Sequence, residues 1–501
     1  GAFALDSNTT ANFNTAVGYN ALGANTTGAA NTGTGRATLS ANTTGNNNTA
    51  LGYHALLSNT TGSSNVALGR DALDANTTAT HNVAVGTDAL GANTTGTQNT
   101  ALGALSLDAN TTANNNTAIG YSSLGANTTG NSNLSAGHNS MAINTTGNQN
   151  VALGMQTLFH NNADNNVAVG HYALESNTSG ANNVGVGKSA LDACTTGSSN
   201  TAVGTNAGLD LTTATDSAFF GHSAGSNVTT GSFNTGLGGS SLRDCTTGAN
   251  NVAIGINAAL TLVTGSQNIA IGANTLRGAS GSGSNNVAIG TSSLNVITSG
   301  SNNTGVGTSA LGSNTTAGSN TAIGYQALTS NTTGTQNVAV GSLALDANTT
   351  ANNNVAVGHN SLSANTTGAN NIAMGSGALM VSTTASSNTG LGHEALTANT
   401  TGPANTAVGK DCLKSNTTGG YNSALGDECM AFNTGGSSNV AMGDFTLRSN
   451  TTGSNNVALG ASSLNQNTTA SNNTAVGKSA LNQNTTGTQN TAVGGFALDA
   501  N

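Results

Sequence analysis

Charged and aromatic residues are scarce in this 501-residue sequence. Asp, Glu, Lys and Arg make up 5% of it and aromatic residues 3%, with no tryptophan, whereas charged residues alone are about a quarter of an average globular protein. The net charge of −9 provides no basic surface for nucleic acid. No apolar run approaches the ~20 residues that cross a bilayer. We therefore expect neither nucleic-acid binding nor a membrane span in this segment.

Gly, Asn, Thr, Ala and Ser dominate the sequence, and they recur in a 17-residue unit. Residues 14–30 form one copy, whose residues we number as positions 1 to 17, and the consensus is N-T/V-A-V/L/I-G-x-x-A/S-L-x-A/S-N-T-T-G/A-x-N. Position 5 is glycine in every copy, and position 9 is almost always leucine. One copy before Asn166 is a residue short, and one near Gly278–Ser284 is a residue long. A disordered chain has no reason to keep this phase, so we predict a repeat fold of about 29 coils.

Each coil is predicted to contain a strand, a bend and a polar turn. Positions 1 to 4 alternate as in a strand, and position 4 is nearly always Val, Leu or Ile, so we expect positions 2 and 4 to face inward. Positions 3 and 5 then present Ala and Gly outward, where another backbone can approach closely. A second short strand is expected around positions 8 and 9, followed by N-T-T-G turn chemistry. Stacked coils would form an all-β parallel β-solenoid, or β-roll, with like side chains ~4.8 Å apart.

This arrangement predicts two sets of structural residues. The apolar core per coil is thin, so we expect the Ala/Gly face to be covered by further copies, which makes a homotrimeric rod the preferred assembly. The candidate core residues are Val17, Leu22, Val85, Leu90, Val340, Leu345, Val357 and Leu362. The candidate close-approach glycines are Gly18, Gly86, Gly341 and Gly358.

The repeat is less regular in the middle of the chain. We divide the sequence into regular repeats at 1–193, divergent repeats of the same solenoid at 194–297 and regular repeats at 298–501. In the divergent segment the N-T-T turn is mostly lost, Leu gives way to Gly208 and Gly225, and Phe219-Phe220 appears. Repeat drift explains this change, and a specific binding patch is the alternative.

Residue types that carry chemistry are few and scattered. The eight histidines fall mostly just after the repeat glycine and do not cluster, and no pattern of metal ligands or catalytic residues occurs. We therefore expect no enzyme activity, no cofactor and no metal site. Cys412 and Cys429 occupy position 8 of adjacent coils, where stacking would place them within disulfide range, although two buried free thiols are the alternative.

Two short motifs resemble the head repeats of trimeric autotransporter adhesins. They are the N-T-A-V-G of residues 14–18, 473–477 and 490–494 and the N-V-A-I-G of residues 251–255 and 286–290. The longer unit with its N-T-T-G turn is also similar to repeat regions of phage tail-fibre-like proteins. The resemblance implies a β-roll that assembles as a trimer, although the 17-residue period is longer than the usual adhesin coil.

These features together favour a structural or adhesive fibre segment. We expect it outside the cell, at the cell surface or on a virion tail, with other copies of itself and a surface glycan or host-cell receptor as partners. The alternative is an ice-binding β-solenoid, which a flat array of outward threonines would suit.

Overall fold

The protein is an all-β parallel β-solenoid, as the repeat predicts. The computed structural model describes residues 1–278 and 281–499. The chain forms two compact units, Gly1–Asn250 and Asn251–Asn501, and their boundary falls inside the segment that the sequence marks as divergent. The long coil near Gly278–Ser284 includes residues 279 and 280, which lie outside the described residues.

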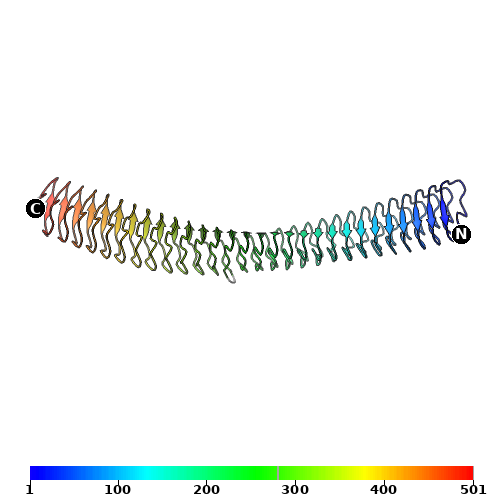
Figure 1. Ribbon diagram of the computed structural model, residues 1–501, viewed down its shortest axis with the longest axis horizontal. Coiled ribbons are helices and arrows are strands. Elements are labelled where there is room, and N and C mark those ends of the chain that lie inside the picture. Colours follow the sequence, from blue (N-terminus) through cyan, green and yellow to red (C-terminus); the bar gives the residue numbers. More distant parts are fainter. Residues whose placement is uncertain (279–280, 500–501) are drawn as a thin grey trace. The chain divides into compact units, whose positions relative to one another are not determined.

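Each described coil contributes one three-residue strand, and the coils of each unit follow one another in chain order (Figure 1). The strands of the first unit are β1 (Thr15–Val17), β2 (Thr32–Thr34), β3 (Thr49–Leu51), β4 (Val66–Leu68), β5 (Val83–Val85), β6 (Thr100–Leu102), β7 (Thr117–Ile119), β8 (Leu134–Ala136), β9 (Val151–Leu153), β10 (Val167–Val169), β11 (Val184–Val186), β12 (Thr201–Val203), β13 (Ala218–Phe220) and β14 (Thr235–Leu237). The strands of the second unit are β15 (Val252–Ile254), β16 (Ile269–Ile271), β17 (Val287–Ile289), β18 (Thr304–Val306), β19 (Thr321–Ile323), β20 (Val338–Val340), β21 (Val355–Val357), β22 (Ile372–Met374), β23 (Thr389–Leu391), β24 (Thr406–Val408), β25 (Ser423–Leu425), β26 (Val440–Met442), β27 (Val457–Leu459), β28 (Thr474–Val476) and β29 (Thr491–Val493).

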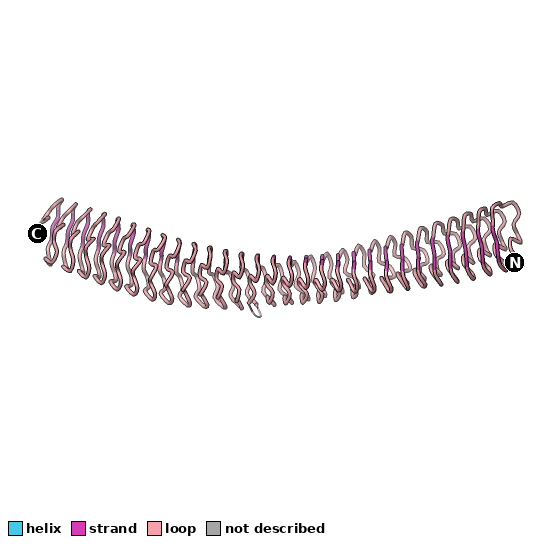
Figure 2. Tube along the Cα trace, in the orientation of Figure 1, coloured by secondary structure: helices cyan, strands magenta, loops and turns pink. Residues whose placement is uncertain are grey.

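Within each unit, consecutive strands pair in parallel and in register. Val338 of β20 lies opposite Val355 of β21, one repeat further along, and the other pairs keep the same relation. The remainder of each coil is turns and loops (Figure 2). In-register stacking gives every residue an equivalent neighbour in the coil above and below it.

The predicted orientation of the strand is wrong. Position 3 faces inward, as at Ala50, which is 0% exposed, whereas Leu51 at position 4 is 45% exposed and Val17 is 56% exposed. Val85, Val340 and Val357 are half-buried at the same outward position. The cause is the leucine at position 9, which fills the interior of the coil. A Cβ atom on Gly33, at position 3, would lie 3.6 Å from the Leu22 side chain of the preceding coil, so only a small inward residue fits there.

The leucines at position 9 are in the core, as predicted. Leu22, Leu90, Leu345 and Leu362 are all fully buried.

The predicted second strand does not form. Positions 8 and 9 are both buried, as at Ala344 and Leu345, whereas consecutive side chains of a strand point to opposite faces. The backbone achieves this with a left-handed leucine, whose φ is +55° at Leu345 and +52° at Leu362. The left-handed region is costly for a branched residue, so burial of the leucine is what stabilises this turn.

The position 5 glycines make close contacts within one chain. Gly18, Gly86, Gly341 and Gly358 have φ between +132° and +139°, a region that L side chains rarely adopt. A Cβ atom on Gly341 would lie 2.5 Å from the carbonyl oxygen of Gly358 in the next coil. The close approach is therefore between successive coils, and the Ala/Gly strand face on which we placed the trimer contact is instead interior.

No helix among the described residues has the length and apolar character of a bilayer-crossing segment.

Candidate functional site

The outward strand face is an apolar surface that follows the strands of each unit. We use this name for the side chains at positions 2 and 4 of the strands. Position 2 is mostly Thr or Val and position 4 mostly Val, Leu or Ile, and neither position carries a charged residue in any described strand. Met374 and Met442 of this face are 45% and 51% exposed. An exposed surface normally carries about a quarter to a third charged residues, so this face is atypical of one that meets only water.

A shallow apolar hollow lies on this face in the second unit. Its volume is about 200 Å³, and it spans β24, β25 and β26. The residues that line it are Thr406, Val408, Ser423, Ala424, Leu425, Val440, Ala441 and Met442. The hollow occurs where the small Ser423 stands in a column of Thr and Val.

The opposite turn is held by a ladder of buried asparagines at position 12. The Nδ2 of Asn42 donates to the Oδ1 of Asn25 in the preceding coil, at 2.7 Å, and to the carbonyl of Gly45 in its own turn, at 3.1 Å. Asn31 at position 1 donates to that same carbonyl at 2.8 Å. Thr43 adds a bond from its hydroxyl to the carbonyl of Thr60 in the following coil. The turn that the N-T-T-G motif predicts is therefore present, and its side chains bond the backbone.

Breaks in the asparagine ladder leave buried acceptors without partners. The unpaired Oδ1 atoms among the described ladder residues belong to Asn144, Asn177 and Asn365. Asn144 precedes the coil that is one residue short, Asn177 precedes Cys194, and Asn365 precedes Ser382. An acceptor is therefore left unpaired where the next coil is a residue short or has no asparagine at position 12.

An apolar column replaces the asparagine ladder in the divergent part of the first unit. We use this name for Cys194, Leu211, Val228 and Cys245, which occupy position 12 and are fully buried. The threonine bonds persist beside the column, as from Thr212 to Thr229 at 3.0 Å. Only the asparagine of the N-T-T turn is lost there, not the turn itself.

Phe219 compensates for two missing leucines in the same region. It occupies the inward position 3 and is fully buried. Gly208 and Gly225 replace Leu at position 9 with φ of +59°, and a Cβ atom on Gly208 would lie 3.4 Å from the Phe219 ring. A Cβ atom on Gly225 would overlap that ring. The phenyl ring thus fills the space that the leucines leave.

A charged patch lies on the second unit at positions 7 and 10. We use this name for Glu394, Asp411, Lys414, Glu428 and Arg448. Lys414 Nζ lies 2.5 Å from Glu394 Oε2 and 3.3 Å from Asp411 Oδ1, and Arg448 Nη2 lies 2.6 Å from Glu428 Oε2. A hollow of about 250 Å³ lies beside these residues. The residues that line the hollow are Asp411, Lys414, Ser415, Glu428, Ala431 and Phe432.

One group of metal-ligand type borders this patch. His393, Glu394 and Asp411 offer ligand atoms within 4.8 Å of one another. The ammonium group of Lys414 already contacts both carboxylates, so the group is held together by an ion pair on the protein surface.

The four cysteines are buried free thiols. Burial raises the pKa of Cys194 and of Cys245 to about 12. The thiol of Cys429 within hydrogen-bond reach raises the pKa of Cys412, and burial raises it further. Both members of this stacked pair are fully buried, and the disulfide between them stays a prediction.

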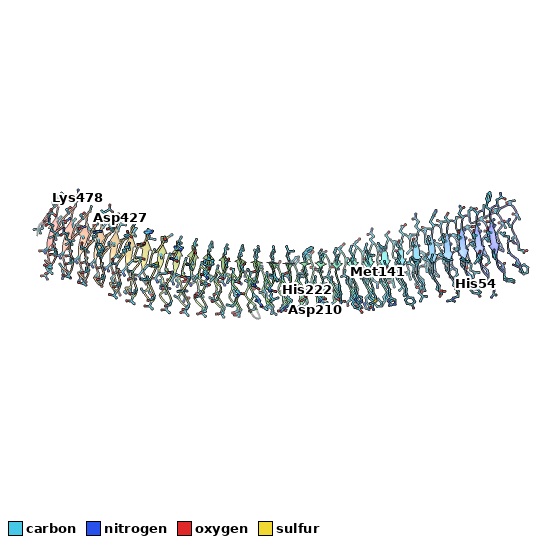
Figure 3. All side chains as sticks on the ribbon, in the orientation of Figure 1. His54, Met141, Asp210, His222, Asp427 and Lys478 are labelled. Atoms are coloured by element: carbon cyan, nitrogen blue, oxygen red, sulfur yellow. The ribbon has the colours of Figure 1, made fainter. Side chains whose placement is uncertain are left out.

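The histidines lie in separate coils, as the sequence indicates. Figure 3 labels His54 and His222, which belong to different coils of the first unit. His54 Nδ1 lies 3.3 Å from Asp71 Oδ1, and this is a surface contact between neighbouring coils.

Comparison with known proteins identifies no relative. No protein-family model matches the chain, and no curated protein matches it. The family resemblance of the short motifs therefore stays a prediction, whereas the fold stands on the structure.

Sequence reasoning missed the outward strand face because it assigned the branched residues to the core. A signal was present in the sequence: a large residue appears at position 3 only where the leucine at position 9 is lost, at Phe219 beside Gly208 and Gly225. Positions 3 and 9 must therefore share one space.

Proposed function

We propose that this chain is a structural or adhesive segment of an extracellular fibre and that it catalyses no reaction. The observation that carries the proposal is the continuity of bonding between coils within each unit. Backbone strands, asparagine ladders and threonine bonds all run along the stacking direction. Because these side chains join each coil to the next, the stack keeps its shape without any bound group. This favours a structural element that bears mechanical load.

The location follows from the same proposal. The chain would lie outside the cell, at the cell surface or on a virion tail, and its partners would be further copies of itself. For an adhesive role, a surface glycan or host-cell receptor is the further partner, and the hollow beside the charged patch offers carboxylates, Lys414 and the half-exposed Phe432 as contacts.

Immunogold electron microscopy with an antibody against the repeat tests this proposal. We expect gold label on filaments outside intact cells or on virion tails. Label confined to the cell interior would overturn it.

An ice-binding solenoid is the second candidate, and the exposure of position 2 favours it. Thr15 and Thr49 stand in one outward column with Val66 in the first unit, and Thr406 stands in such a column with Val440 in the second. A flat array of small hydroxyl and methyl groups is what such a role needs. Thermal hysteresis of a monomeric chain would support this candidate, and its absence would exclude it.

A further inference from the structure

We infer that the outward strand face is the surface through which this chain binds a second copy of itself. The inference rests on the proposed function, because it names the surface on which a fibre segment assembles. It also moves the self-contact from the Ala/Gly face, which is interior, to positions 2 and 4.

The size of the face fits a contact between two copies. In the first unit it runs over 14 strands. At ~4.8 Å between strands and a width of about 10 Å, the face of one unit covers roughly 700 Å². Each partner of a standard interface buries about 800 Å². One unit of each partner therefore supplies nearly a complete interface.

The chemistry of the face also fits a copy of itself. Positions 2 and 4 carry no charge in the described strands, so two such faces can meet without burying an unpaired ion. The side chains project from strands with one fixed spacing, and only a partner with the same spacing can interdigitate with them along many coils. An unrelated globular protein would lose this match after a few strands.

Charged residues border one edge of the face in part of the second unit. Position 6, just beyond the face, holds Lys410, Asp427, Asp444 and Lys478 there, whereas in other coils it holds exposed residues such as Tyr19 and Ile256. Polar edges around an apolar centre are the usual arrangement of a protein interface. The hollow at β24 to β26 lies at the centre, where a partner side chain can fill it.

The mass of the purified chain in solution tests the inference, measured by sedimentation equilibrium. The wild-type chain should have a mass of at least twice the 48.4 kDa of a single chain. Leu425→Lys combined with Met442→Lys places two ammonium groups on the face, and Leu51→Lys with Leu102→Lys does the same in the first unit. We expect each pair to weaken association at least ~100-fold, because an uncompensated charge would be buried.

Matched controls place the same charges on the opposite turn. Thr418 and Thr452 are exposed at position 14 of coils in the same region, and Thr418→Lys with Thr452→Lys should leave the mass unchanged. The circular dichroism spectrum of every variant must match that of the wild type, since the substituted side chains are exposed on the single chain. The melting temperature of the control pair must also be unchanged, whereas that of the face pairs should fall, because association stabilises the folded chain. Crosslinking gives a readout that does not depend on affinity. If the two copies pack in parallel and in register, Met442→Cys yields crosslinked pairs with a short bismaleimide and Thr452→Cys does not.

Two outcomes would overturn the inference. One is a wild-type chain that is monomeric at every concentration, with or without thermal hysteresis. The other is an oligomer whose mass the lysine pairs leave unchanged. A monomer that still decorates the cell exterior would leave the proposed function standing, whereas an oligomer confined to the cell interior would overturn the proposed function alone.

Discussion

Two regions of the first unit fill the buried position 12 in opposite ways, one with asparagines and the other with apolar side chains. From Asn8 to Asn144 the buried position 12 is an asparagine ladder, with bonds of 2.7 to 3.1 Å between successive coils. From Cys194 to Cys245 the same position is an apolar column. The ladder satisfies every internal amide, and the column has none to satisfy. The cost lies where the ladder ends or is interrupted, since the Oδ1 of Asn144 and the Oδ1 of Asn177 are left without a donor.

The comparison explains why the apolar residues occur as a block. A single apolar residue inside the ladder would leave one acceptor unpaired, and so does a block of four. Buried polar groups cost free energy only when they lack partners. The same single cost is therefore shared among more coils as the block lengthens. At position 12 the divergent segment is therefore a second version of the coil, in which the buried side chains are apolar and need no hydrogen-bond partner.

The largest expected effect comes from Phe219. Phe219→Ala should destabilise the chain by about 4 kcal/mol, because Gly208 of the preceding coil and Gly225 of its own coil supply no leucine at position 9 to fill the cavity. The urea midpoint by circular dichroism measures the loss. Adding Gly208→Leu and Gly225→Leu to Phe219→Ala rebuilds the regular coil and should recover most of it, and a triple variant no better than the single one would refute the compensation.

Leu211→Asn introduces an amide into the apolar column. We expect a loss of about 3 kcal/mol, since a buried leucine is removed and the new Oδ1 has no donor in the coil above or below. Leu211→Met is the control and should change the unfolding midpoint little. An asparagine tolerated as well as methionine would mean that water reaches this column.

Asn93→Leu makes the reverse change within the ladder. It removes the donor to Asn76 Oδ1 and one acceptor of Asn110, so a loss of about 2 kcal/mol is expected. Asn93→Ser should cost a similar amount, because Ser382 at this position leaves the Oδ1 of Asn365 without a donor. If Asn93→Leu leaves the unfolding midpoint unchanged, the ladder contributes nothing to stability.

The smallest expected effect comes from Asp192, whose carboxyl lies near the apolar column in sequence. Burial, together with the neighbouring Glu175, raises the pKa of Asp192 to about 6. The contribution of this carboxyl to the stability of the folded chain is therefore most favourable below its unfolded pKa of 3.8. It is lost as the pH rises through 6. Asp192→Asn should stabilise the chain at pH 7 by less than ~1 kcal/mol, because the group is half exposed, and should have no effect at pH 3. Equal effects at both pH values would contradict this assignment.

The sequence predicted the parallel solenoid, its 17-residue coil and the buried leucines, because these follow from the period alone. It did not predict which strand face is interior, since the alternation rule assigns branched residues inward. In this coil Leu22 and its equivalents already fill the interior, so Ala50 and its equivalents are the residues that fit there. It also did not predict the left-handed leucines, because a branched residue with positive φ is disfavoured locally and is stabilised only by packing.

Cysteine accessibility tests the strand orientation most directly. Ala373 is 0% and Met374 45% exposed in β22, and the four native cysteines are buried. In the Leu425→Lys/Met442→Lys background, the maleimide labelling rates of Ala373→Cys and Met374→Cys should differ widely. The account predicts rapid labelling of Met374→Cys in the folded chain and labelling of Ala373→Cys only on unfolding. The reverse order would place the valine and leucine face in the interior and contradict it.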